Sequence, residues 1–146
     1  MSIFLPLLAG GAGLVAGTGA IAAAYSRRIG RQVDRNIPPD GGFHAIRGHR
    51  IHVRDIGQGP AIVMIHGLAG QMRNFAAVVE QLRASHRIVL IDRPGSGHSP
   101  GRGDDSLTDQ AGIVAGLIDA LGLDRPLIVG HSLGGAVSMA LALDHP

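Results

Sequence analysis

The sequence predicts an α/β fold in which a mostly parallel sheet is covered by helices. Three short apolar runs, at residues 61–65, 88–91 and 126–129, are rich in branched aliphatic side chains. Such continuous runs are typical of strands that are buried on both faces. Segments with apolar residues at helical spacing lie between these runs and after the last one. This alternation of strand and helix predicts parallel strands joined by helical crossovers.

A pair of strands around Gly48 is the first element of the predicted domain, and it leads to a turn at residues 55–60 (DIGQGP). The first apolar strand then ends at residues 66–70 (HGLAG), and the second ends at residues 92–99 (DRPGSGHS). Glycine and proline at these positions predict tight turns where each strand ends. We assign the loop at 92–99 a structural role.

Two helices between the strands are indicated by apolar side chains at three- and four-residue spacing. The first contains Phe75, Val78, Val79 and Leu82, and the second contains Ile113, Leu117 and Leu121. Ser106 and Thr108 are both candidates for the N-cap of the second helix. A third helix, rich in small residues, is predicted at residues 134–143.

Residues 130–134 (GHSLG) lie between the last predicted strand and the third helix. A G-x-S-x-G motif in this context is typical of a nucleophile elbow, in which a strained turn exposes a serine hydroxyl. Gly130 and Gly134 lack a Cβ and let the strand and helix approach closely. The helix N-terminus favours negative charge that develops beside Ser132. The alternative is a glycine-rich turn with an ordinary serine.

Together and in this order, these segments resemble the N-terminal part of an α/β-hydrolase domain of the esterase, lipase and haloperoxidase-like group. The resemblance covers residues 43–146. It implies that Ser132 is the nucleophile and that the backbone N–H groups of Leu133 and Leu68 form the oxyanion hole.

The resemblance also assigns supporting residues around this site. His66 and Gly67 form the oxyanion turn, and His131 is a packing or pocket residue beside the nucleophile. Gly130 and Gly134 allow the close packing of the elbow. We expect no cofactor and no metal at this site.

The general base and the acid of the family are not identified in this sequence. The family order is serine, then Asp or Glu, then His, and Asp144 and His145 are the candidates that follow Ser132. A helix rises about 1.5 Å per residue, which puts His145 too far from Ser132 to accept its proton. We therefore expect a hydrolase domain truncated after the elbow helix, with the elbow strand at an unpaired edge. We expect this chain alone to be inactive.

The remaining histidines do not indicate a metal site or a second catalytic site. His44, His49 and His52 lie around the first strand pair, but no carboxylate or cysteine joins them at the spacing of metal ligands. His86 and His98 are predicted to be surface or loop residues.

The motif and the resemblance predict a serine hydrolase that acts on small carboxylic esters. Serine at the nucleophile position argues against dehalogenase and epoxide hydrolase chemistry, for which the family uses aspartate. Three alternatives stay open: a C–C bond hydrolase, a perhydrolase, and a non-catalytic membrane-anchored scaffold with a hydrolase-like domain. The sequence indicates neither the substrate nor the oligomeric state.

Residues 2–26 carry no charged side chain and are long enough to span a bilayer as a helix. Four arginines follow at positions 27, 28, 31 and 35, and no basic side chain precedes the segment. We therefore expect residues 1–36 to be a hydrophobic membrane anchor, with the domain on the cytoplasmic side. The alternative is a signal segment cleaved near residues 22–24 and an exported protein. Residues 37–42 (IPPDGG) are expected to form the linker.

Composition excludes a few further classes. The net charge is +2, and the arginines are scattered outside the N-terminal cluster, so nucleic-acid binding is not indicated. The chain has no cysteine, which excludes disulfides and cysteine catalysis.

Overall fold

The computed structural model describes residues 24–25, 28–30, 32, 35–101, 103 and 105–146. The chain divides into two units, Met1–Pro38 and Pro39–Pro146, and the division falls within the expected linker. No helix among the described residues is both long and apolar enough to cross a membrane. Most of the expected membrane anchor lies outside the described residues, so the anchor stays a prediction.

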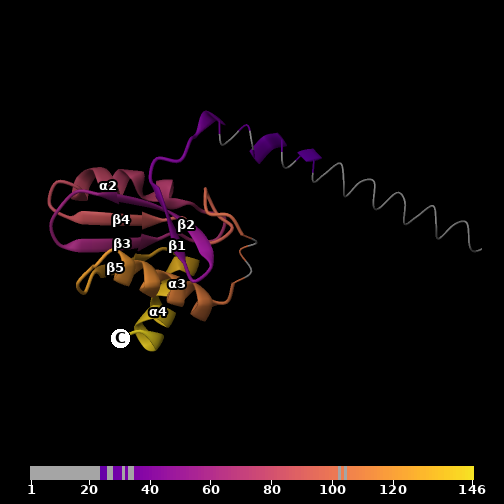
Figure 1. Ribbon diagram of the computed structural model, residues 1–146. Coiled ribbons are helices and arrows are strands. Elements are labelled where there is room, and N and C mark those ends of the chain that lie inside the picture. Colours follow the sequence, from indigo (N-terminus) through magenta and orange to yellow (C-terminus); the bar gives the residue numbers. More distant parts are fainter. Residues whose placement is uncertain (1–23, 26–27, 31, 33–34, 102, 104) are drawn as a thin grey trace, which may run out of the picture. The chain divides into compact units, whose positions relative to one another are not determined.

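The second unit is built on a five-stranded sheet with the spatial order β1–β2–β4–β3–β5 (Figure 1). The strands are β1 (Gly42–Ile46), β2 (His49–Ile56), β3 (Ala61–Ile65), β4 (Arg87–Ile91) and β5 (Leu127–Gly130). β1 pairs antiparallel with β2, and β2 pairs antiparallel with β4. β3 is parallel to both β4 and β5. The predicted α/β fold, with the three apolar runs as parallel neighbours, is confirmed.

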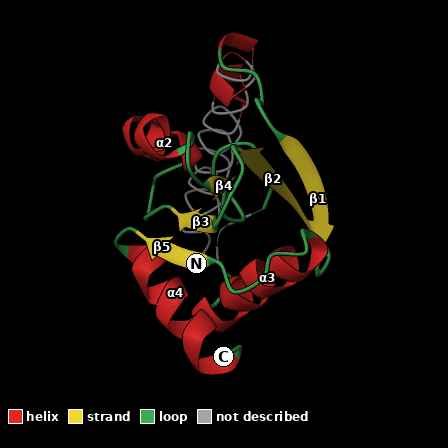
Figure 2. Ribbon diagram, turned by 90° about the vertical axis from the view of Figure 1, so that its left-hand side faces the viewer, coloured by secondary structure: helices red, strands yellow, loops and turns green. Residues whose placement is uncertain are grey.

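Helices cover both faces of this sheet. They are the 3₁₀-helix η1 (Met72–Phe75) and the α-helices α2 (Ala76–Leu82), α3 (Leu107–Ala120) and α4 (Leu133–Asp144). α2 lies on one face, and α3 and α4 lie together on the other (Figures 1 and 2). The two faces of β3 and β4 are therefore both covered, as the apolar runs predict.

Side chains of the central strands alternate between two apolar cores. On β3, Val63 and Ile65 pack with residues of α3 and α4, whereas Ile62 and Met64 pack with residues of η1 and α2. β4 alternates in the same way. The period of two follows from the pleat of a strand, which turns successive side chains to opposite faces. These two cores hold the carboxyl ends of β3, β4 and β5 in fixed relative positions.

β5 differs from the prediction of a buried strand. Leu127 is 61% exposed, and no residue of β5 falls in the buried class. The cause is that β5 pairs with β3 on one side and with no other described strand. The predicted burial is wrong for this strand, because a short apolar run is only as buried as the number of its neighbours allows. The expectation that β5 lies at an unpaired edge is confirmed.

The structure decides between the two candidate caps of α3. The Ser106 hydroxyl accepts a hydrogen bond from the N–H of Asp109 at 3.1 Å, and it donates to the Asp109 carboxylate at 2.6 Å. Ser106 is therefore the N-cap, and Thr108 lies inside the helix. The hydrogen bond from Ser106 lowers the pKa of the Asp109 carboxyl.

Candidate active site

Ser132 stands on a sharp turn between β5 and α4. Its φ of 52° and ψ of −116° lie in a region that a residue with a side chain rarely adopts, and its side chain is exposed. A Cβ added to Gly130 would lie 2.3 Å from the carbonyl oxygen of Gly134. A Cβ added to Gly134 would lie 2.1 Å from the carbonyl oxygen of Ile65. The two glycines thus allow the close approach that forces the strained serine outward.

The turn after β3 lies directly against this elbow. A Cβ added to Gly67 would be 3.0 Å from Nδ1 of His131 and 3.1 Å from Cβ of Ser132. The N–H of His131 donates to the carbonyl of Ile65 at 3.0 Å, which extends the pairing of β5 with β3. The ends of two parallel neighbours therefore bring residues 66–70 and Ser132 together, although more than 60 positions separate them in the chain.

Two backbone donors at this junction have no acceptor in the described part of the chain. In the first turn of α4, the N–H of Gly134 donates to the carbonyl of His131, and the N–H of Gly135 donates to the carbonyl of Ser132. The N–H groups of Leu133 and Leu68 make no such bond within the described residues. They are therefore free to donate to a ligand atom. The side chain of Leu68 is 78% exposed, so the turn that carries it is open.

His66 is a fully buried part of the turn and not a proton acceptor for substrate. Its Nε2 accepts the N–H of Arg93 at 3.0 Å, so its proton lies on Nδ1, which donates to the carbonyl of Gly67 at 2.8 Å. Burial lowers the pKa of His66, and the nearby Arg93 lowers it further. His66 is therefore a neutral histidine with both ring nitrogens in use.

Arg93 is a buried cation that holds this turn from beneath. It is 5% exposed, and burial lowers the pKa of its guanidinium. Nε donates to the carbonyl of His66 at 2.9 Å, and Nη2 donates to the carbonyl of Gly67 at 2.9 Å. Nη1 donates to Oε1 of Gln110 on α3 at 2.7 Å. Sequence reasoning assigned Arg93 no role. The signal that was present is an arginine two positions after a buried strand.

Asp92 is buried in the loop after β4, where its carboxylate binds three donors. They are Nδ1–H of His52 at 2.8 Å, the N–H of Met72 at 2.8 Å and the N–H of His98 at 3.0 Å. The hydroxyl of Ser99 donates to the carbonyl of Asp92 at 2.7 Å and accepts the N–H of His52 at 2.8 Å. These bonds give the loop at 92–99 the structural role that was predicted, and they hold this carboxylate in the interior, where it is fully buried.

His52 and His49 do have carboxylate partners, which the sequence did not reveal. His52 pairs with Asp92 in the interior, and Nε2 of His49 lies 3.5 Å from Asp105. Because these pairs are separate, they form no common site. The described residues contain no group of three or more potential metal ligands.

No histidine of the described chain is hydrogen-bonded to Ser132. His145 is the C-cap of the twelve-residue helix α4, whose N-cap is Ser132, so about 18 Å of helix separates them. His86 bonds to Ser85 instead, and His131 is exposed beside the elbow. The nucleophile position and the two free N–H groups are therefore present, whereas no general base is hydrogen-bonded to Ser132 among the residues described.

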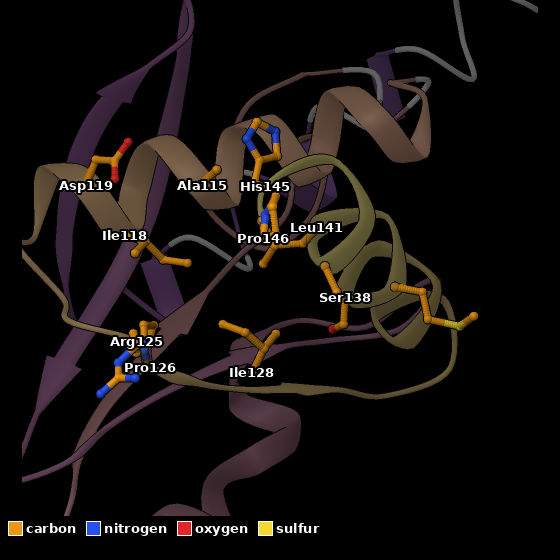
Figure 3. A pocket seen from close by; sticks show the side chains of 12 residues that line it. Ala115, Ile118, Asp119, Arg125, Pro126, Ile128, Ser138, Leu141, His145 and Pro146 are labelled. Atoms are coloured by element: carbon orange, nitrogen blue, oxygen red, sulfur yellow. The ribbon is translucent and has the colours of Figure 1, made fainter.

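An open groove of about 860 Å³ lies away from Ser132, between α3, α4 and the free edge of β5. Figure 3 shows Ile128 of β5 facing Ser138 and Leu141 of α4, with Ile118 of α3 nearby. Most of its lining is apolar, and Arg125, Asp119 and His145 are its ionisable groups. Ser132 and Leu68 are not among the lining residues, so this groove is not the candidate active site.

Comparison with known proteins gives the family. Residues 60–146 match the model of the alpha/beta hydrolase fold family. The chain is 36% identical over 107 residues to a 2-hydroxy-6-oxo-6-phenylhexa-2,4-dienoate hydrolase of Burkholderia cepacia. This alignment covers 66% of this chain and 36% of the hydrolase. The chain is also 38% identical over 89 residues to an sn-1-specific diacylglycerol lipase of Mus musculus, and this alignment covers 60% of this chain and 29% of the lipase. The chain thus spans about a third of the length of these curated relatives.

Solved structures agree with this result. An esterase from Exiguobacterium antarcticum has a TM-score of 0.69 and 29% identity, over 72% of this chain and 40% of the esterase. The meta-cleavage product hydrolase CumD has a TM-score of 0.66 and 27% identity, over 72% of this chain and 41% of that protein. The strand order, the turn at Ser132 and these matches lead to one conclusion: the chain belongs to the alpha/beta hydrolase fold family.

Proposed function

We propose that this protein is a serine hydrolase of small carboxylic esters, in which Ser132 is the nucleophile. The observation that carries the proposal is the exposed Ser132 on a strained turn, next to the free N–H groups of Leu133 and Leu68. Two similar proteins, an esterase from Exiguobacterium antarcticum and a diacylglycerol lipase of Mus musculus, carry names that fit this chemistry. Serine at this position favours acyl transfer over the opening of an epoxide.

In the proposed reaction, Oγ of Ser132 attacks the ester carbonyl carbon and gives its proton to a general base. The carbonyl oxygen becomes an oxyanion, which accepts hydrogen bonds from the N–H groups of Leu133 and Leu68. The C–O bond to the alcohol then breaks, and the alcohol takes the proton back. Water hydrolyses the acyl-serine in a second step of the same kind. We expect the base and the acid that orients it to lie outside the residues described here.

The test is labelling of the full-length protein with a fluorophosphonate, which phosphonylates an activated serine. We expect the label on Ser132, together with hydrolysis of a short p-nitrophenyl ester, and we expect Ser132→Ala to abolish both. Ser138→Ala is the matched control, because Oγ of Ser138 donates to the carbonyl of Gly134 within α4 and has no part in the reaction. A folded full-length protein that neither takes the label nor hydrolyses esters would support a non-catalytic scaffold instead.

Hydrolysis of a C–C bond is the second candidate. It is favoured by the likeness to the dienoate hydrolase of Burkholderia cepacia and to CumD. The same serine and N–H groups serve both reactions, so the substrate assay must decide. Turnover of a 2-hydroxy-6-oxo-dienoate at a kcat/KM far above that of p-nitrophenyl esters would favour the C–C bond hydrolase.

We also propose that the apolar segment within residues 1–36 anchors the protein to a membrane, with the domain on the cytoplasmic side. The proposal is supported by the uncharged stretch at residues 2–26 and the arginines that follow it. Leu14→Arg would place a charge within the segment, and we expect it to move the protein from the membrane pellet to the soluble fraction. Leu107→Arg, at an exposed position of α3, should leave the protein in the pellet. Cleavage of the segment and recovery of the domain outside the cytoplasm would support the signal peptide.

A further inference from the structure

Arg93 donates a hydrogen bond to the peptide group between Gly67 and Leu68. The N–H of this same peptide group is one of the two proposed donors of the oxyanion hole. The carbonyl oxygen of Gly67 accepts three hydrogen bonds: from Nη2 of Arg93 at 2.9 Å, from Nδ1 of His66 at 2.8 Å and from the N–H of Gly70 at 3.2 Å. A trans peptide group is planar, so the N–H of Leu68 points in the direction opposite to that carbonyl. Whatever fixes the carbonyl therefore also fixes the N–H.

We propose that Arg93 is a positioning residue for the oxyanion hole, because it orients and polarises the Gly67–Leu68 peptide group. This proposal rests on the proposed function, in which the Leu68 N–H receives the oxyanion. Arg93 acts from the side opposite to the substrate and touches no reacting atom.

The arrangement around the guanidinium supports an orienting role. Arg93 holds two successive carbonyls, those of His66 and Gly67, with different nitrogens of one planar group. Two such bonds restrain both peptide planes of the turn at once, because the guanidinium presents its donors in a fixed fork. Gln110 fixes the far side of the guanidinium at 2.7 Å, and Nε2 of Gln110 is itself bound to the carbonyl of Asp105.

Charge supports a polarising role. Arg93 is almost fully buried, and its described side-chain partners are two carbonyl oxygens and one amide oxygen, with no carboxylate among them. None of these bonds is an ion pair, so the positive charge acts directly on the carbonyls that the guanidinium contacts. A cation bound to the carbonyl end of a peptide group draws electron density from the amide and strengthens the N–H as a donor, and a low local dielectric enhances this effect. A surface arginine paired with aspartate would polarise the peptide far less.

The experiment compares Arg93→Met and Arg93→Lys in the full-length protein with a matched arginine control. Arg87→Met is the control, because Arg87 lies at the start of β4 and pairs with Asp55 at 2.7 Å, while both side chains are partly exposed. Two quantities are measured: the constants kinact and KI for labelling by a fluorophosphonate, and the ¹H–¹⁵N resonance of the Leu68 amide. Thermal unfolding establishes that each variant is folded.

We expect Arg93→Met to lower kinact about tenfold or more while KI stays the same, since loss of an oxyanion donor acts on the transition state. The Leu68 resonance should shift upfield as the N–H loses polarisation. Arg93→Lys should be intermediate, because an ammonium keeps the charge but lacks the planar fork that holds both carbonyls in fixed directions. Arg87→Met should match the wild type in both quantities. A folded Arg93→Met variant with unchanged kinact and an unchanged Leu68 resonance would overturn the proposal.

Two further outcomes are also decisive. If Arg93→Met does not fold, Gln110→Met removes one partner of the guanidinium, and we expect a smaller shift of the Leu68 resonance in the same direction. An unmoved Leu68 resonance in both Gln110→Met and Arg93→Lys would then refute the role of Arg93. If the wild type takes no label at Ser132, the proposed function fails, and the Leu68 resonance of the Arg93 variants still decides whether Arg93 orients this peptide.

Discussion

Gly134 lies so close to the carbonyl oxygen of Ile65 that a Cβ on Gly134 would be 2.1 Å from it. The backbone of Gly134 and the backbone of Ile65 both belong to packed elements, so neither can move aside at low energetic cost. We expect Gly134→Ala to lower the free energy of unfolding by about 2 kcal/mol or more. Gly135→Ala is the matched control, since its nearest atom would be at 3.6 Å. It should raise stability by roughly 0.5–1 kcal/mol, as alanine does inside a helix. Urea unfolding measures both changes, and equal effects of the two variants would contradict this account.

Ser132 holds a positive φ of 52°, so its backbone is strained by the side chain it carries. Glycine adopts such a conformation without that strain, although it costs more entropy on folding. We expect Ser132→Gly to be more stable than Ser132→Ala by about 1 kcal/mol, because alanine retains the strain. Thermal unfolding of the two variants tests this, and the reverse order would show that the turn is not strained.

Ser106 caps α3, and Thr108 does not. Ser106→Ala removes the acceptor of the Asp109 N–H, and we expect it to cost about 1 kcal/mol of unfolding free energy. Thr108→Ala has no cap to lose and should change stability by less than about 0.5 kcal/mol. Both positions are exposed, so the difference between them isolates the cap. A larger loss in Thr108→Ala would place the start of the helix elsewhere.

The buried His66 predicts a pH dependence of stability. Its pKa is lowered from 6.5 in the folded state, mainly by burial, so below pH 6.5 the unfolded chain binds a proton that the folded chain does not. Stability therefore falls as the pH drops from 6.5 towards the lowered pKa, with a slope of at most about 1.4 kcal/mol per pH unit from this group. The full contribution is present above pH 6.5.

His66→Gln should flatten this slope, because glutamine does not titrate. Unfolding free energies measured by urea between pH 7.5 and pH 5 give the slope for each variant. Ser106→Ala serves as the control, since it lowers stability without removing a titrating histidine and should keep the slope of the wild type. An unchanged slope in His66→Gln would show that His66 is not held neutral by the fold.

The order and the type of the elements were predictable from local pattern. The apolar runs that became β3 and β4 are buried on both faces, and their side chains alternate between two cores as expected. The turn at Ser132 follows from the positions of Gly130 and Gly134, because backbone contact at those positions admits no side chain. The contact between Gly130 and Gly134 is local in the chain, so the sequence motif carries it, whereas the contact of Gly134 with Ile65 depends on the packing of α4 against β3.

Burial and pairing were less predictable, because they depend on neighbours that are distant in the chain. β5 has the composition of a buried strand, yet Leu127 is exposed, since the sheet offers β5 a single partner among the described strands. The spacing of residues in the sequence indicated no carboxylate partner for His52. The pairing of β2 with β4 nevertheless brings Oδ2 of Asp92 to 2.8 Å from Nδ1 of His52.

The sequence by itself therefore determined the α/β fold, the elbow and the position of the candidate nucleophile. Tertiary structure alone decided that the Leu68 N–H is free and that the turn carrying it rests on Arg93, 25 residues further along the chain. The physical reason is the parallel sheet, which lines up the carboxyl ends of β3, β4 and β5 at one edge. Hydrogen bonds between these loops need distances and directions that only that edge provides.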